Sequence, residues 1–179
     1  MIGHVEACCG RAEFREHQKQ ILSRNLSGLF LPVSFINKGQ NVIAVYRAEG
    51  FCPLDHYPVT DAGRALDIVI CLINKMIRAE DHYLFVGDYR ISPDLIFVEG
   101  PFMDMPVLDV AMIWKQGDGS AELSRGLQEV LYLLRQQCAS GGEYLEIAAR
   151  TASCRFLGLR AIKKRFCRLR DEIYENLSG

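Results

Sequence analysis

The alternation of apolar and polar residues predicts an N-terminal part made of strands and a longer helical part after it. Two apolar runs, residues 29–36 and 42–48, are rich in residue types that favour strands. The turn between them contains Gly39, which tolerates the positive φ of a hairpin. The pattern therefore predicts a small antiparallel hairpin, preceded by a short polar helix over residues 11–24.

The next part of the chain predicts a connector and a long helix. Pro53 and Pro58 disfavour regular structure, so residues 50–58 are expected to continue neither strand nor helix. Thr60 is a candidate N-cap, and Asp61 suits the positive end of a helix dipole. Apolar residues then recur at helical spacing, at Leu66, Val69, Ile70, Ile73 and Ile77. This stripe predicts one amphipathic helix with a wide buried face.

Three short strands are expected after this helix, over residues 83–86, 95–99 and 107–114. Glycine, proline, serine and aspartate residues separate them and favour turns. Alternation in the third strand places Val110, Met112 and Trp114 towards the core and Asp109 on the opposite, wetter face.

The C-terminal third predicts three helices. Ser120 is a candidate cap for the first, whose apolar face includes Leu127, Val130, Leu131 and Leu134. A second helix is expected over residues 143–153. The last carries a stripe at Leu159, Ile162, Phe166, Leu169, Ile173 and Leu177. This stripe predicts packing onto the parent domain, with a coiled-coil seam as the alternative.

Length and composition indicate a single α+β domain over residues 1–179, subdivided into 11–58, 59–153 and 154–179. The chain is 49% hydrophobic with a net charge of −1, as in globular proteins. It has neither an apolar run of about 18 residues nor the basic, then apolar start of a signal peptide. The seven cysteines are scattered, without a C-x-x-C pair. We therefore expect a cytoplasmic protein with reduced thiols.

Residues 83–99 resemble the outline of a protein-kinase catalytic loop. In kinases the sequence H-R-D-L-x-x-x-N precedes an apolar strand, and the Asp accepts the substrate proton while the Asn binds a metal ion. Aligning Ile91-Ser92-Pro93-Asp94 with the corresponding kinase run puts Arg90 at the position of the Asp and Leu95 at that of the Asn. Arginine has no acceptor and leucine no oxygen, so neither can perform these roles.

The other kinase motifs are equally incomplete. A phosphate-covering loop needs several closely spaced glycines, whereas the predicted hairpin turn has only Gly39. The strand that should carry a phosphate-pairing lysine has only Arg47, at its end. Asp109 matches the first residue of the metal-binding D-F-G motif, but one carboxylate without the lysine and asparagine is a poor magnesium site.

The order of elements resembles a bacterial domain family of unknown function that usually precedes a forkhead-associated (FHA) phosphothreonine-binding domain. The segments that carry this resemblance are LSRNLSGLFLPVSFINKGQNVIAVYRAEG, RALDIVICLINKMIRAEDHYL, SPDLIFV and LQEVLYLLRQQ. The resemblance implies a degenerate protein-kinase-like fold, similar to the cytoplasmic pseudokinase domain of a type VII secretion component. It implies a small N-terminal hairpin with a mainly helical C-lobe. An FHA domain is absent from these residues.

The strongest charge feature lies near the C-terminus. Residues 155–170 contain seven basic residues and no acid. On a helix Arg160, Lys163 and Lys164 share a face, which suits an acidic partner, an anionic membrane surface or nucleic acid. No aromatic platform for bases accompanies them, so we expect no nucleic-acid partner. The alternative interpretation is a solvated face of a docked helix.

These observations predict a protein that is not an enzyme and needs no cofactor. We expect a scaffolding or protein-interaction module, in a signalling or secretion-related assembly, whose partner-binding residues are Arg160, Lys163 and Lys164. One alternative is an atypical nucleotide-binding kinase that uses Asp109 and Arg47. A second is a nucleic-acid or membrane-surface adaptor acting through the basic helix.

Overall fold

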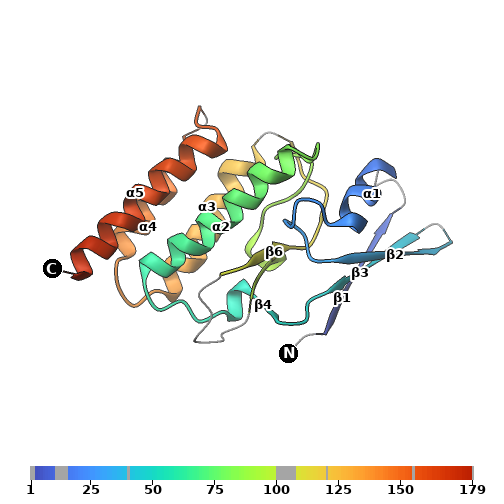
Figure 1. The fold of residues 1–179 in the computed structure, drawn as a ribbon, viewed down its shortest axis with the longest axis horizontal. Helices are drawn as coiled ribbons and strands as arrows, with labels where there is room; N and C mark the ends of the chain where they lie inside the picture. The colour runs from blue at the N-terminus through green and yellow to red at the C-terminus, as the bar shows by residue number, and fades with distance from the viewer. Residues whose placement is uncertain are drawn as a thin grey trace.

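The computed structural model describes residues 3–10, 16–39, 41–99, 108–119, 121–154 and 156–178. Two small antiparallel sheets and five α-helices in these residues confirm the α+β class. The sheet made by β1, β2 and β3 lies at one end of the molecule with α1 beside it, and helices α2 to α5 lie towards the other end (Figure 1). The elements are β1 (His4–Gly10), α1 (Glu16–Arg24), β2 (Val33–Lys38), β3 (Asn41–Arg47), β4 (Phe51–Pro53), α2 (Ala62–Glu80), β5 (Ile96–Glu99), β6 (Val110–Met112), α3 (Glu122–Gln137), α4 (Gly142–Ala152) and α5 (Leu159–Ser178).

The predicted hairpin is confirmed as β2 and β3, but it is part of a three-stranded sheet in the order β1-β3-β2. The sequence prediction missed β1, so the N-terminal unit begins at His4 rather than at residue 11. The ladder pairs Ala7 of β1 with Ala44 of β3. Val5 is the one strong strand former in β1, while Ala7 and Gly10 are types depleted in strands, so the composition does not mark it as a strand. Backbone pairing along the whole of β3 supplies the missing stabilisation.

The connector at residues 50–58 was predicted wrongly, because it contains β4 and a short 3₁₀ helix, Leu54–His56. The second sheet has the order β4-β5-β6, and Pro53 pairs with Phe97. A proline is tolerated here because β4 is an edge strand and Pro53 is its last residue.

Residues 29–31 connect the two sheets. The Met112 N–H donates to the Leu29 carbonyl at 2.8 Å, and the Leu31 N–H donates to the Met112 carbonyl at 2.9 Å. The strand predicted over 29–36 therefore begins at Val33, and its first residues pair with β6 instead.

Residues 110–114 are all buried, so the predicted inward and outward alternation is absent. Helix α2 packs against β6, and all of these residues belong to the core.

Helix α2 is the central element of the core, and its predicted apolar stripe is buried. Its N-cap is Asp61 rather than Thr60: the Asp61 carboxylate accepts the Arg64 N–H at 2.9 Å. The strand predicted over 83–86 is wrong. Tyr83 has a φ of 61°, and the Leu84 N–H donates to the Ala79 carbonyl, so these residues close the end of α2.

Helix α5 runs antiparallel to α2 (Figure 1) and buries the stripe Leu159, Ile162, Phe166, Leu169 and Ile173. The predicted packing onto the parent domain is confirmed for these residues. Two polar contacts to Asp67 of α2 fix the far end of α5: Arg170 lies at 3.5 Å, and the Tyr174 hydroxyl donates at 2.8 Å. Burial, with the hydrogen bond to Asp67, raises the pKa of Tyr174 to about 12.

None of the described helices has the length and apolar composition needed to cross a bilayer.

Candidate functional site

The loop at residues 87–95, which resembles the kinase catalytic loop, lies between α2 and β5 and is held on two sides. On one side it pairs with residues 115–119. The Arg90 N–H donates to the Lys115 carbonyl at 2.8 Å, and the Gly117 N–H donates to the Asp88 carbonyl at 3.1 Å. A Cβ at Gly117 would lie 2.5 Å from the Gly87 carbonyl oxygen, so this close approach requires glycine.

On the other side, loop 87–95 is anchored to the start of α3 by a buried carboxylate. Glu122 is 1% exposed, and its Oε1 accepts the Ile91 N–H at 3.1 Å. Its Oε2 accepts from the Arg125 guanidinium at 2.6 Å, which balances the buried charge. This role could not be predicted from the sequence, because an acidic residue in a first helical turn usually interacts only with the helix dipole.

Gly126 allows α3 to approach loop 87–95 closely. A Cβ at this position would overlap the Ile91 side chain and lie 2.6 Å from the Ile91 carbonyl oxygen. Glu122 and Gly126 are one helical turn apart and contact the same residue, one through a hydrogen bond and one through packing. The main chain of loop 87–95 is thus fixed at Ile91.

The two side chains that the sequence aligned with the kinase Asp and Asn differ in their exposure. Leu95 is buried, with 9% exposed, and Arg90 is half-buried. The loop aspartates form local turns, as the sequence indicated: Asp88 accepts the Phe85 N–H at 3.0 Å, and Asp94 accepts the Ser92 hydroxyl.

Asp109 lies away from the loop. Its carbonyl accepts the Glu99 N–H at 2.9 Å, which places it at the end of the β5–β6 hairpin opposite Leu95. Across from Leu95 lies Ile113, whose N–H donates to the Leu95 carbonyl at 2.8 Å. The Asp109 carboxylate forms an ion pair with Lys75 of α2, whose side chain is 13% exposed. The face of the third predicted strand that was expected to be wetter is therefore half-buried at Asp109, and the charge of Asp109 is neutralised by Lys75.

Three aromatic rings fill the space beside loop 87–95. Phe30 and Tyr89 meet edge to face with 5.4 Å between ring centroids, and Trp114 lies 5.4 Å from Phe30 and 5.9 Å from Tyr89. All three residues are at most 2% exposed. Such contacts stabilise beyond the area that they bury. We call these residues the aromatic cluster.

The Tyr89 hydroxyl is buried without a hydrogen-bond partner in the part of the chain that the structure describes. Burial is also the main cause that raises the pKa of Tyr89 above its ordinary value. Because an unsatisfied buried hydroxyl opposes folding, we expect Tyr89→Phe to raise the free energy of unfolding by about 1 kcal/mol, measured by urea denaturation. Tyr174→Phe is the matched control with the opposite expected sign, since its hydroxyl donates to Asp67. A Tyr89→Phe protein that is less stable than the wild type would contradict this prediction.

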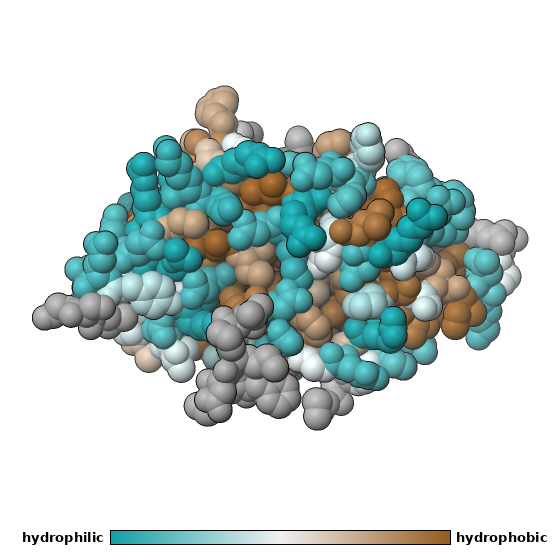
Figure 2. Space-filling model, viewed as in Figure 1, coloured by the Kyte–Doolittle hydropathy of each residue, from teal (hydrophilic) through white to brown (hydrophobic). Residues whose placement is uncertain are grey.

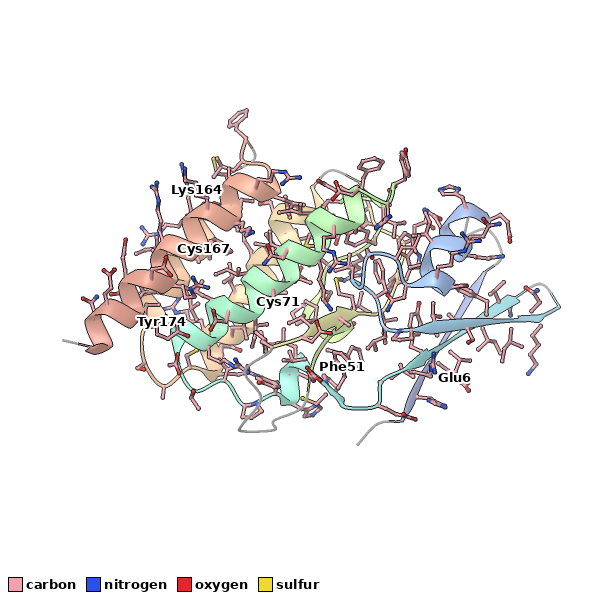
Figure 3. All side chains as sticks on the ribbon, viewed as in Figure 1. Glu6, Phe51, Cys71, Lys164, Cys167 and Tyr174 are labelled. Carbon is pink, nitrogen blue, oxygen red and sulfur yellow. The ribbon has the colours of Figure 1, made fainter. Side chains whose placement is uncertain are left out.

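The structure brings the three predicted partner-binding residues together at one groove between α5 and α2, of about 440 Å³. We call it the cationic groove; it is lined by Ile77, Arg160, Lys163, Lys164, Cys167, Arg168 and Asp171. Figure 2 shows apolar side chains in the strip between α5 and α2, flanked by hydrophilic ones. Figure 3 shows Lys164 and Cys167 along the first half of α5. The sequence identified the cations but not Ile77, which α2 contributes.

Arg47, to which only the alternative kinase interpretation gave a role, is exposed at the end of β3 and forms no ion pair with the described residues. Within the same residues, no cluster of three or more histidine, cysteine or acidic side chains is arranged to hold a metal ion. Cys8 and Cys9 lie in β1, and the structure does not describe their side chains.

The chain matches no protein-family model and no curated protein with which it was compared.

Proposed function

We propose that this chain is a non-catalytic protein-interaction module with a degenerate kinase-like fold, which acts as a scaffold in a cytoplasmic signalling or secretion-related assembly. The observation that carries the proposal is the set of residues around loop 87–95. In a kinase, oxygen ligands for the metal ions come from the catalytic loop and from the end of the neighbouring strand. Here the corresponding neighbours are Leu95, Ile113 and Trp114, which offer no carboxylate.

The contacts of the loop support the same proposal. Glu122 and Gly126 hold Ile91 from α3, and Gly117 lies against the opposite side. The aromatic cluster occupies the adjacent space. These contacts fix the main chain of the loop against α3 and residues 115–119.

The unpaired cations on α5 favour a binding role over a solvated helix face. Arg160, Lys164 and Arg168 follow one another at intervals of four residues, a spacing at which like charges repel on a helix. None of them forms an ion pair within the described residues. An anionic partner would relieve this repulsion. The cationic groove is therefore the proposed interaction surface.

A thermal shift experiment with Mg-ATP tests the non-catalytic assignment, and we expect an unchanged melting temperature. At about 5 mM Mg-ATP, a site with a Kd of about 50 μM would stabilise the folded state by about 2.7 kcal/mol and raise the melting temperature by roughly 5–10 °C. Magnesium tripolyphosphate at the same concentration controls for phosphate binding to surface cations.

The same titration is repeated on the R160A/K163A/K164A variant, which removes the cations proposed to bind an anion. A saturable shift with ATP but not with tripolyphosphate, retained in this variant, would show a nucleotide site elsewhere. That result would contradict the proposed function and favour an atypical kinase.

A further inference from the structure

The charge of the cationic groove is almost entirely uncompensated. Four cations line it, and the one acid at its edge, Asp171, already forms an ion pair with Arg170 at 2.7 Å. Arg160, Lys164 and Arg168 are exposed, and Lys163 is half-buried. Cations that share one concave surface reinforce each other's potential and attract anionic groups.

The floor of the cationic groove is apolar. Ile77 enters it from α2 and is 9% exposed, and Cys167 of α5 is half-buried beside it. Apolar contacts with the floor would give a ligand affinity that persists when salt screens the charges. The ligand that fits best therefore combines negative charges with an apolar side chain.

The dimensions suit a short stretch of polypeptide. From Arg160 to Asp171 the helix advances about 16 Å, at about 1.5 Å per residue. An extended segment of about five or six residues covers the same length. Its alternate side chains point to opposite sides, so some can meet the cations while others reach the floor or the solvent.

The packing of α5 disfavours a membrane surface as the occupant. Helices that bind to a bilayer bury an apolar face in it, but the apolar stripe of α5 is already buried within the domain. Within the groove the apolar residues Ile77 and Cys167 form the floor and do not protrude. Nucleic acid is disfavoured because none of the lining residues is aromatic.

From these observations we infer that the cationic groove binds an extended acidic segment of a partner protein. The carboxylates meet Arg160, Lys163, Lys164 and Arg168, and an apolar side chain packs on Ile77 and Cys167. This inference rests on the proposed function, because it specifies the partner chemistry of the same surface.

The test is fluorescence anisotropy with a labelled peptide of about six residues in which Glu and Leu alternate. We expect saturable binding to the wild type, weakened roughly tenfold or more in the R160A/K163A/K164A variant. The single variant Lys164→Glu should weaken binding in the same direction, and it changes only an exposed residue. A peptide that alternates Glu and Ser should bind more weakly, because it cannot use the apolar floor.

The matched control variant is R24A/K38A/R165A. It removes the same number of positive charges from exposed sites outside the groove, and Arg165 lies on the same helix. Its affinity for the Glu and Leu peptide should stay within about twofold of the wild type. Arg24 and Lys38 lie on other elements, where salt screens their charges, and Arg165 is not part of the groove lining. Equal loss in both triple variants would reflect net charge alone and would overturn the inference.

Anionic vesicles of phosphatidylserine and phosphatidylcholine, and single-stranded oligo-dT, form the other arms of the test. Phe156 is 97% exposed in the turn before α5. An exposed aromatic ring next to a basic helix favours binding to a bilayer, so the vesicle experiment tests a real alternative. Binding to vesicles or oligo-dT without binding to the peptide would overturn the inference, as would no binding at all. Neither result changes the Mg-ATP titration, so failure of this inference is distinguishable from failure of the proposed function.

Discussion

Replacing Gly126 by alanine is expected to lower the free energy of unfolding by about 3 kcal/mol, or the melting temperature by roughly 6–12 °C. The added Cβ would lie 2.6 Å from the Ile91 carbonyl oxygen. A main-chain oxygen cannot rotate away, and the Ile91 N–H is held by Glu122. The only relief is to widen the gap between α3 and loop 87–95. Urea denaturation, monitored by circular dichroism, measures the loss.

The matched control is Gly142→Ala at the start of α4. Its Cβ would make only ordinary contacts, with the nearest atoms of Arg135 at 3.7 Å. Alanine is about 1 kcal/mol better than glycine inside a helix, so this variant should be neutral or more stable. Equal stability of the two variants would mean that α3 does not pack closely on Ile91.

Glu122→Ala is expected to lower the free energy of unfolding by about 2–3 kcal/mol. The substitution leaves the buried Ile91 N–H without an acceptor and removes a charge-assisted hydrogen bond. Arg125 adds less to the loss, because its side chain is 46% exposed and water can solvate it. The same urea denaturation measures this effect.

The variant Glu122→Gln separates the hydrogen bond from the charge. Its side-chain carbonyl can still accept the Ile91 N–H, so we expect a loss of only about 1 kcal/mol. The double variant E122A/G126A should lose less free energy of unfolding than the sum of the losses of E122A and G126A, because both substitutions act on Ile91. Additive losses would indicate two independent contacts.

The main helices and the central hairpin could be predicted from the sequence because each has its own periodic stripe. Leu66, Ile73 and Ile77 mark α2, and Leu159, Phe166 and Ile173 mark α5; all of these residues are buried as expected. The strands β1 and β4 were missed for a physical reason. Their stability comes from pairing with β3 and β5, which are distant in sequence, rather than from their own composition.

The site was predictable only in part. The cations of α5 were visible as a charge run, and helical spacing correctly placed Arg160, Lys163 and Lys164 on one surface. The groove itself depends on Ile77 from another helix. Glu122 contacts a residue 31 positions away, and no local pattern encodes such a contact. One signal was available for Gly126, since a glycine inside a helix lowers its stability and often indicates close packing.

The most direct test of this account is amide hydrogen exchange on the wild-type protein, with Mg-ATP and with the Glu and Leu peptide added separately. We predict that the peptide slows exchange in the first half of α5 and around Ile77, and that Mg-ATP slows it nowhere. Slower exchange with Mg-ATP in residues 87–95 and 110–116 would contradict the account. It would show that the loop still binds a nucleotide.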